Sequence, residues 1–230
     1  MRFNKQVTVV IPAINEEKSI AKVIGEIPPW VDSVVVGDNG SSDRTAAVAQ
    51  AAGAVVVCEP RRGYGSACLR ALAAMPADTD IVVFLDGDYS DYPEEMAQLV
   101  DPIAQNEADL VIGSRVAKAA RGALTPQAIF GNWLATRLIR LFWGVTYSDL
   151  GPFRAISKAG LDRLQMVDPD YGWTVEMQIK AAQRGLRDKE VPVRYRKRIG
   201  TSKVSGTIRG VWGAGTKILS VIFRSALFRK

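Results

Sequence analysis

Four short apolar runs dominate the first hundred residues, and segments of helical length separate them. The runs cover residues 7–11, 34–36, 54–58 and 81–85. Runs this short that are almost wholly apolar predict strands buried on both faces of a sheet. The segments between them, residues 15–27, 41–52 and 64–75, have Ser, Gly or Pro near their ends, as helices do. Repeated strand–helix units predict an α/β fold with a mostly parallel central sheet and helices on both faces.

Polar loops follow three of the predicted strands, at residues 12–17, 37–43 and 86–92. In an open α/β sheet the loops that leave the strand carboxyl ends lie at one rim, where ligands bind. Asp86 and Asp88 stand one residue apart in the third loop, and paired carboxylates suit hard cations such as Mg²⁺ or Mn²⁺ that bridge to phosphates. The chain lacks both the P-loop and the glycine fingerprint of nicotinamide-binding enzymes, which argues against those two classes.

The residue composition limits the chemistry further. The 230 residues include no histidine, which excludes histidine-ligated zinc and Ser-His-Asp catalysis and leaves carboxylates as the usual general bases. The two cysteines match no metal-binding spacing and fit a reduced, cytoplasmic setting. No run reaches the roughly 18 apolar residues that span a bilayer, and the N-terminus lacks the apolar region of a signal peptide. We therefore expect a cytoplasmic protein that is soluble or peripheral on a membrane.

Basic residues accumulate toward the end of the chain. The net charge is +6, yet residues 184–230 hold 13 Lys and Arg against two acidic residues, so the preceding body is acidic. A basic tail on an acidic body favours an anionic surface or ligand as its partner. We expect no nucleic-acid partner, because the sequence contains no recognised nucleic-acid-binding module.

Helical spacing over residues 207–228 separates an apolar from a basic and polar face. The apolar face holds Ile208, Val211, Ile218, Ile222 and Ala226. The basic and polar face holds Arg209, Thr216, Lys217, Ser220 and Arg224. A basic amphipathic helix flanked by Trp212 and Phe223 predicts binding to an anionic membrane surface. The alternative is that the apolar face packs on the domain. Residues 129–143 form a second amphipathic stretch, which could border a lipid acceptor.

Seven motifs follow one another along the chain. They are residues 9–17 (Val-Val-Ile-Pro-Ala-Ile-Asn-Glu-Glu), 37–45 (Gly-Asp-Asn-Gly-Ser-Ser-Asp-Arg-Thr), 84–88 (Phe-Leu-Asp-Gly-Asp), 109–115 (Asp-Leu-Val-Ile-Gly-Ser-Arg), 149–155 (Asp-Leu-Gly-Pro-Phe-Arg-Ala), 191–193 (Val-Pro-Val) and 198–203 (Arg-Ile-Gly-Thr-Ser-Lys). Together they resemble family 2 glycosyltransferases, most of all the branch of dolichol-phosphate mannose synthase and bacterial polyprenyl-phosphate glycosyltransferases. The resemblance covers residues 7–206. It implies a GT-A fold that takes an NDP-sugar donor, a UDP- or GDP-sugar, with Mg²⁺ or Mn²⁺ as cofactor.

The resemblance gives the first two motifs a role in nucleotide binding. Asp38 matches the aspartate that reads the base, where a carboxylate accepts a hydrogen bond from a ring N–H. The family often has a second aspartate at the next position, where this chain has Asn39. Pro12, Ala13 and Glu16 match the loop that lines the base and ribose.

Arg62 and the glycines around it are expected to meet the donor phosphates. The guanidinium would neutralise charge, while Gly63 and Gly65 would let the backbone approach the phosphate closely. An ordinary strand-to-helix turn is the alternative explanation of these glycines.

The third motif supplies the expected metal ligands, Asp86 and Asp88, with Gly87 between them in the nucleotide-sugar site. Asp88 is expected to ligate the metal directly, and Asp86 to face the ribose or a metal-bound water. Asp91 either assists them or caps the helix that follows. A metal that bridges the diphosphate would stabilise the negative charge that develops on the leaving group.

The acceptor half begins near Asp149, which the resemblance puts in the catalytic pocket. An alcohol acceptor requires a general base, for which Asp149 and Glu176 are the candidates, and Glu176 could equally be a structural carboxylate near a helix N-terminus. A phosphate acceptor is already anionic and instead requires cations. The candidate cations are Arg115, Arg154, Arg196, Arg198 and Lys203. The alternatives are internal ion pairs for Arg115 and Arg154 and a solvated run for residues 196–198.

We therefore expect a metal-dependent glycosyltransferase that moves a sugar from an NDP-sugar to a polyprenyl phosphate on the cytoplasmic face of a membrane. The resemblance to dolichol-phosphate mannose synthase further implies an inverting enzyme, one that inverts the anomeric carbon. The expected GT-A domain covers residues 1–205, with a nucleotide-sugar half at 1–115 and an acceptor half at 116–205, followed by the amphipathic helix at 206–230. One alternative is transfer to a soluble or lipid hydroxyl. Others are a catalytically silent nucleotide-sugar-binding subunit and a nucleotidyltransferase that forms sugar nucleotides.

Overall fold

The computed structural model describes residues 1–200 and 208–227, and its centre is a seven-stranded sheet of order β3-β2-β1-β4-β6-β5-β7. The strands are β1 (Val7–Ala13), β2 (Ser33–Asp38), β3 (Val55–Cys58), β4 (Ile81–Phe84), β5 (Leu110–Ser114), β6 (Arg154–Ser157) and β7 (Asp188–Pro192). The first four run parallel, as does the pair β5–β7, while β6 is antiparallel to both of its neighbours. The expected mostly parallel sheet is confirmed.

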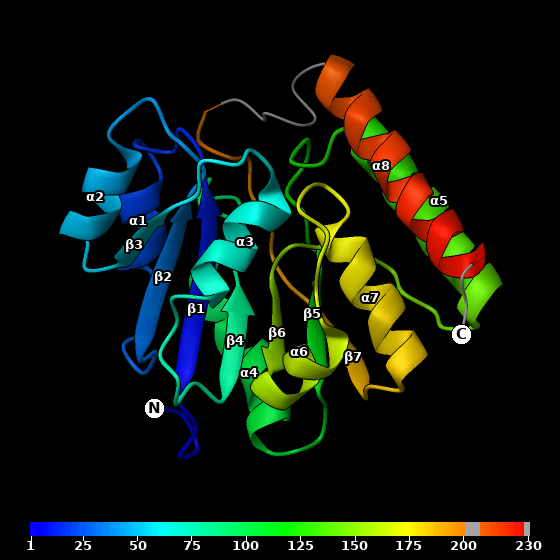
Figure 1. Ribbon diagram of the computed structural model, residues 1–230, viewed down its shortest axis with the longest axis horizontal. Helices are drawn as coiled ribbons and strands as arrows, with labels where there is room; N and C mark the ends of the chain where they lie inside the picture. Colours follow the sequence, from blue (N-terminus) through cyan, green and yellow to red (C-terminus); the bar gives the residue numbers. More distant parts are fainter. Residues whose placement is uncertain (201–207, 228–230) are drawn as a thin grey trace.

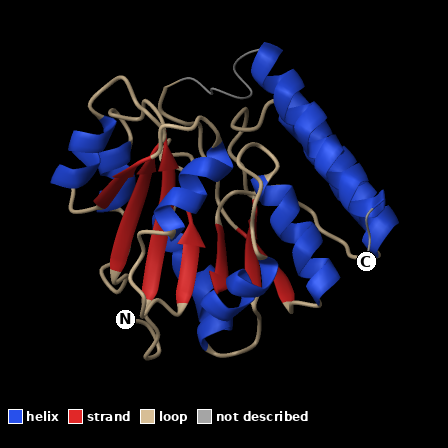
Figure 2. Ribbon diagram, in the orientation of Figure 1, coloured by secondary structure: helices blue, strands red, loops and turns tan. Residues whose placement is uncertain are grey.

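Helices cover both faces of this sheet (Figure 2). They are α1 (Ile20–Gly25), α2 (Thr45–Ala51), α3 (Tyr64–Leu72), α4 (Met96–Ala104), α5 (Pro126–Trp143), α6 (Lys158–Leu164), α7 (Trp173–Arg184) and α8 (Ile208–Leu227), with a short 3₁₀ turn, η1, at Pro93–Glu95. Two apolar cores result, one under α1, α2 and α4 and the other under α3 and α5–α8. Along β1, Val9 and Ile11 face the first core and Val10 the second, while the one polar side chain of the run, Thr8, is buried and shares a hydrogen bond with the Thr79 hydroxyl (2.8 Å).

The helix expected over residues 15–27 is shorter in the structure, where α1 begins at Ile20. Hydrogen bonds to the loop after β2 hold the preceding residues in a non-helical path. The amide of Asn15 donates to Ser41 Oγ (2.9 Å), and that of Glu16 donates to Thr45 Oγ1 (2.7 Å). Asn15 itself has a φ of 53°, a conformation that asparagine tolerates better than most residues. These hydrogen bonds join the loop after β1 to the loop after β2 and to the first residue of α2.

The C-terminal helix α8 lies alongside α5 at the edge of the molecule (Figure 1). Its Ile222 is fully buried, and Phe223 meets Phe142 of α5 edge-to-face with the ring centroids 5.9 Å apart. The inner face therefore packs on the domain, as the packing alternative expects. Trp212 and Leu227 remain 75% and 80% exposed. Binding of this outer face to a membrane stays a prediction. In the described part of the chain, no helix is long and apolar enough to cross a bilayer.

Candidate active site

The carboxyl ends of β1 and β2 form one wall of a cavity of about 290 Å³. Ala13 and Asp38 end these strands in register. Pro12, Ala13 and Arg62 line the cavity, so the structure brings together three of the expected donor-binding residues. Asp38 does not line the cavity, although the next residue, Asn39, does; Asp38 is 6% exposed, and one of its oxygens accepts from the Ser41 amide (3.2 Å). Its other oxygen is buried and has no hydrogen-bond partner among the described residues. A donor from a ligand would remove the cost of that unsatisfied acceptor.

Asn39 has a structural role that explains why it is not an aspartate. Its side-chain nitrogen donates to the carbonyls of Glu59 (3.2 Å) and Arg61 (2.7 Å), and its oxygen accepts from the Gly63 amide (2.8 Å). A carboxylate has no proton to donate to the two carbonyls. The side chain therefore fixes the 59–63 loop, and with it Arg62, whose guanidinium donates to the Asn39 carbonyl (2.9 Å).

Gly63 and Gly65 accommodate the protein's own backbone. A Cβ on Gly63, where φ is +139°, would lie 2.1 Å from the Pro169 carbonyl oxygen, and one on Gly65 would lie 1.9 Å from that of Asp168. The Ser66 amide donates to the Pro169 carbonyl at 2.8 Å. Close approach is thus required, as expected, but the approaching group in the structure is the 168–170 loop and not a phosphate. Glu16, the remaining base-loop residue, accepts from the Ser19 hydroxyl (3.0 Å).

Three carboxylates gather in the 86–92 loop that follows β4. Asp88 and Asp91 are 4% and 2% exposed, and Asp86 is partly exposed. Neither oxygen of Asp91 has a hydrogen-bond partner among the described residues, and η1 takes Tyr92 as its N-cap, so Asp91 does not cap that turn. Burial, together with the neighbouring carboxylates Asp86 and Asp88, holds the pKa of Asp91 well above its usual range.

Asp86 is held in place by Tyr64, a residue that the sequence patterns did not single out. The Tyr64 hydroxyl donates to Asp86 Oδ1 at 3.0 Å. Burial and the adjacent charge of Asp88 raise the pKa of Asp86 to about 7. Gly87 sits between the two aspartates against Ile20 and Ile11, which leaves little room for a larger residue. No group of three potential metal-ligating side chains lies close enough to enclose a cation within residues 1–200 and 208–227. The protein would thus supply two carboxylates, which suits a metal completed by waters and phosphates.

The segment after β7 lies along the 86–92 loop and brings Arg198 to it. The amide of Arg196 donates to the Ser90 carbonyl (2.8 Å), and that of Ile199 to the Asp88 carbonyl (2.9 Å). Arg198 Nη1 then forms an ion pair with Asp88 Oδ2 at 2.8 Å. The Arg196 guanidinium pairs with Glu26 instead (2.7 Å), so residues 196–198 are not simply a solvated run. Lys203 lies outside the described residues.

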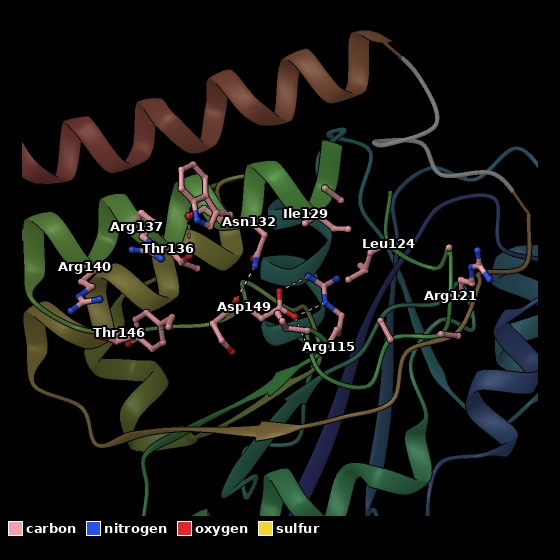
Figure 3. Close-up of a pocket in the computed structure, with 18 residues that line it drawn as sticks. Arg115, Arg121, Leu124, Ile129, Asn132, Thr136, Arg137, Arg140, Thr146 and Asp149 are labelled. Atoms are coloured by element: carbon pink, nitrogen blue, oxygen red, sulfur yellow. Dashed lines mark hydrogen bonds and ion pairs between the residues drawn. The ribbon is translucent and has the colours of Figure 1, made fainter. Parts of the chain in front are cut away.

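Arg115 and Asp149 form a buried, bidentate ion pair (Figure 3). Arg115 donates to one Asp149 oxygen from Nη2 (2.7 Å) and to the other from both Nε and its own backbone amide (2.8 Å each). Burial opposes the charge on Arg115, but the attraction of Asp149 prevails and raises the pKa of the guanidinium. The internal ion pair expected as the alternative for Arg115 is confirmed. Asp149 does lie beside a cavity, yet both of its oxygens are already engaged.

Two further expected site residues have their charged groups engaged inside the fold. Arg154 is fully buried, and its guanidinium donates to the carbonyls of Gly151 and Thr174 (3.0 Å each). Glu176 pairs with Lys180 (2.7 Å) and accepts from the Asp168 amide (2.8 Å). We therefore correct the expectation that Arg154 binds the acceptor phosphate, because backbone carbonyls, which no sequence pattern reveals, take its hydrogen bonds. The structural alternative holds for Glu176, which fixes the loop before α7.

A larger cavity, of about 760 Å³, opens beside the carboxylates. At its polar end lie Asp86, Arg115 and Arg198. Its remaining wall is mainly apolar and comes from the first half of α5, the loop before β6, the start of α7 and the middle of α8, including Phe130, Leu134, Ala135, Leu150, Trp173, Ala214, Ile218 and Leu219. A second cavity, of about 580 Å³, adjoins the first, since Arg115, Ala128 and Asn132 line both. It runs along α5 and carries Arg121, Arg137 and Arg140 (Figure 3). An apolar cavity with charged groups at one end is typical of a ligand site.

The model of the family described as Glycosyl transferase family 2 matches residues 8–164 of the chain. The chain belongs to glycosyl transferase family 2. An uncharacterized glycosyltransferase of Mycobacterium tuberculosis is 39% identical to this family 2 chain, over 89% of it and 92% of the relative. The dolichyl-phosphate hexose transferase of Haloferax volcanii is 31% identical over 95% of both chains. The expected NDP-sugar-dependent glycosyltransferase is confirmed as to family and enzyme class.

A solved structure supports the same assignment for this family 2 enzyme. The crystal structure of glucosyl-3-phosphoglycerate synthase from Mycobacterium tuberculosis, in complex with Mn²⁺, UDP-glucose and phosphoglyceric acid, superposes with a TM-score of 0.79 and 27% identity. The match covers 99% of this chain and 82% of that one. It confirms the expected GT-A fold.

Proposed function

We propose that this enzyme transfers a hexose from an NDP-sugar to the phosphate of a polyprenyl phosphate at a membrane surface. The observation that carries the proposal is the 760 Å³ cavity, which joins an apolar wall on α5 and α8 to Asp86, Arg115 and Arg198. A lipid phosphate needs both parts, an apolar channel for its isoprene units and cations for its head group. The dolichyl-phosphate hexose transferase of Haloferax volcanii is similar along nearly its whole length.

The donor would occupy the smaller cavity and the 86–92 loop. Asp38 carries the unpartnered oxygen that a base N–H would satisfy, and Arg62, which lines the smaller cavity, would face the phosphates. The carboxylates of Asp86 and Asp88 fit Mg²⁺ or Mn²⁺, and the unpartnered Asp91 just behind them supports a cation at this place. When bound, such a metal supplies charge stabilisation for the departing diphosphate. The related glucosyl-3-phosphoglycerate synthase binds Mn²⁺ together with UDP-glucose.

The state of Asp149 favours an acceptor that needs no general base. Both of its oxygens are held by Arg115, so a proton taken from an alcohol would neutralise the charge on which this buried ion pair depends. A phosphate monoester is largely ionised at neutral pH and can attack the sugar carbon directly. Direct attack on the face opposite the leaving diphosphate inverts the anomeric carbon, which agrees with the resemblance described above.

The outer surfaces of α5 and α8 are suited to a membrane. Phe130 and Trp133 on α5 are 62% and 51% exposed, and Trp212 on α8 is 75% exposed. Arg137 and Arg140 on α5 are also exposed and have no acidic partner among the described residues. Aromatic side chains next to basic ones are the composition of interfacial helices on anionic lipid. The same helices form the apolar wall of the large cavity, so a lipid acceptor could pass from the bilayer into the site.

A soluble phosphorylated acceptor is the second candidate. Its support is the 580 Å³ cavity, because Arg121, Arg137 and Arg140 could hold a small anion there, and because glucosyl-3-phosphoglycerate synthase is a structural neighbour. Incubation of the purified enzyme with UDP-glucose or GDP-mannose, Mn²⁺ and one acceptor at a time tests both proposals. The acceptors are a polyprenyl phosphate in detergent, the corresponding polyprenol, and 3-phosphoglycerate, with the product followed by mass spectrometry.

We expect product from the polyprenyl phosphate alone. Product from the polyprenol would favour a hydroxyl acceptor, and product from 3-phosphoglycerate would favour the soluble candidate. Failure to bind any nucleotide sugar would contradict the donor site itself, whereas binding of a nucleotide sugar without transfer to any acceptor would support the silent nucleotide-sugar-binding subunit.

A further inference from the structure

The ion pair between Arg198 and Asp88 joins a cation of the protein to one of the two carboxylates suited to a metal. The pair is short, 2.8 Å, and largely removed from water, with the two side chains 30% and 6% exposed. The other Asp88 oxygen is engaged as well, because it accepts from the Ser90 amide (2.9 Å) and from the Ser90 hydroxyl. A divalent cation that uses Asp88 therefore has to compete with groups that are already hydrogen-bonded to it.

Backbone hydrogen bonds make Arg198 a fixed neighbour of this loop. Tyr195 pairs with Asp91 as an antiparallel bridge, and the amides of Arg196 and Ile199 donate to the carbonyls of Ser90 and Asp88. The backbone on both sides of Arg198 is thus fixed to the loop, so the guanidinium can reorient without any movement of the segment. That guanidinium also lines the large cavity, next to Asp86.

From this geometry we infer that the Arg198 guanidinium is paired with Asp88 in the ligand-free enzyme. When donor and metal bind together, the guanidinium moves to the donor diphosphate. The inference rests on the proposed donor site. Without the donor, the metal must compete with Arg198 for Asp88, and it also meets the repulsion of a nearby guanidinium. With the donor, the phosphates attract the guanidinium away from Asp88 and provide further oxygen ligands. The ion pair thereby makes metal binding depend on the nucleotide, which protects the site from being filled by metal alone.

The test measures the affinity for Mn²⁺ alone, by electron paramagnetic resonance of free Mn²⁺, and the affinity for UDP in saturating Mn²⁺, by calorimetry. In the variant Arg198→Gln we expect Mn²⁺ alone to bind about tenfold more tightly, because a hydrogen bond between charged groups no longer competes. We expect UDP in Mn²⁺ to bind about tenfold more weakly, because the diphosphate loses a charged partner. Arg198→Lys keeps the charge, so both of its affinities should lie between those of the wild type and those of Arg198→Gln.

The opposite signs of the two changes distinguish this role from a structural one, which would weaken both affinities. The matched control is Arg194→Gln, which removes the same charge four residues away, where Arg194 pairs with Glu95 and Glu94 at the surface. It should change neither affinity. Unchanged or weaker binding of Mn²⁺ alone by both Arg198 variants would overturn the inference. If the wild-type enzyme binds neither Mn²⁺ nor UDP, alone or together, the result contradicts the proposed donor site itself, on which the inference about the ion pair rests.

Discussion

Arg115 holds both carboxylate oxygens of Asp149, through its guanidinium and its own backbone amide. Because the two side chains are only 15% and 2% exposed, either group alone would be a buried charge without a partner. We expect Asp149→Asn to lower the free energy of unfolding by about 3 kcal/mol, measured by urea denaturation. The double variant Arg115→Gln/Asp149→Asn should recover part of this loss, because two amides can hydrogen bond to each other. If Asp149→Asn abolishes turnover and leaves stability and donor binding intact, Asp149 acts as a base and a hydroxyl acceptor is favoured.

Because the buried carboxylate of Asp91 has no partner among the described residues, we expect its replacement to stabilise the protein and to weaken ligand binding. Its burial at 2% exposure, next to Asp86 and Asp88, destabilises the ligand-free protein. Asp91→Asn should therefore raise the stability in EDTA by about 1 kcal/mol and weaken the binding of UDP in Mn²⁺ at least about tenfold. Asp162→Asn, at an exposed pair with Lys158, is the control that should alter neither. A destabilised Asp91→Asn variant would mean that the carboxylate has a structural partner.

Asp88 provides the direct test of metal dependence. Asp88→Ala should abolish turnover at ordinary Mn²⁺ concentrations, since removal of one stabilising electrostatic contact typically costs about 10²–10³ in rate. The thermal transition should stay within a few degrees of the wild type, because the loss of the ion pair with Arg198 is offset by relief of the repulsion between Asp88 and the carboxylates of Asp86 and Asp91. Full activity of this variant in saturating Mn²⁺ would contradict the assignment of Asp88 as a metal ligand.

Asn39 predicts that the aspartate common at this position in the family is harmful in this chain. Asn39→Asp would set a carboxylate against the carbonyl oxygens of Glu59 and Arg61 and free the 59–63 loop. We expect a loss of about 1–3 kcal/mol in the free energy of unfolding, together with a raised KM for the donor through displacement of Arg62. An Asn39→Asp variant as stable as the wild type, with the same KM, would show that the loop has another support.

The exposed aromatic residues of α5 and α8 predict membrane affinity that can be reduced by substitution. Replacing Trp133 and Trp212 by Ser should reduce sedimentation with anionic vesicles about tenfold or more, since each indole loses its burial among the head groups. Val55→Ser is the control, because Val55 is similarly exposed (52%) but lies on β3 at the far edge of the sheet. Equal loss in the control, or none in the double variant, would contradict the proposed surface. Donor binding in solution should remain unchanged in all of them.

Much of the fold was predictable because it depends on local pattern. The four apolar runs became β1–β4, since most of their side chains enter one of two cores, although the edge strand β3 leaves Val55 and Cys58 exposed. The loops at the strand ends followed from the parallel arrangement, and so did the neighbourhood of Ala13, Asp38 and Asp86. The position of β6, antiparallel between β4 and β5, depends on pairing between distant segments, which local periodicity does not encode.

The partners of charged groups were much harder to predict than the groups themselves. Motifs identified Arg154 and Arg198 as cations, but one became buried among backbone carbonyls and the other paired with Asp88. The hydroxyl of Tyr64 was overlooked because a tyrosine at a helix start is ordinary, and its role appears only when α3 and the loop after β4 meet. Such contacts depend on side-chain direction in the folded chain, and sequence spacing does not specify that direction.

The contact of Gly63 and Gly65 with the 168–170 loop has a consequence for protein engineering. These residues come from opposite halves of the chain, yet their backbones touch so closely that any Cβ would meet a carbonyl oxygen at about 2 Å. Chimeras that join the donor half of one relative to the acceptor half of another must therefore take both segments from the same parent. A crossover between residues 115 and 116 without that precaution would disturb the contact of residues 63–65 with the 168–170 loop. It would thereby displace Tyr64 from its hydrogen bond with Asp86.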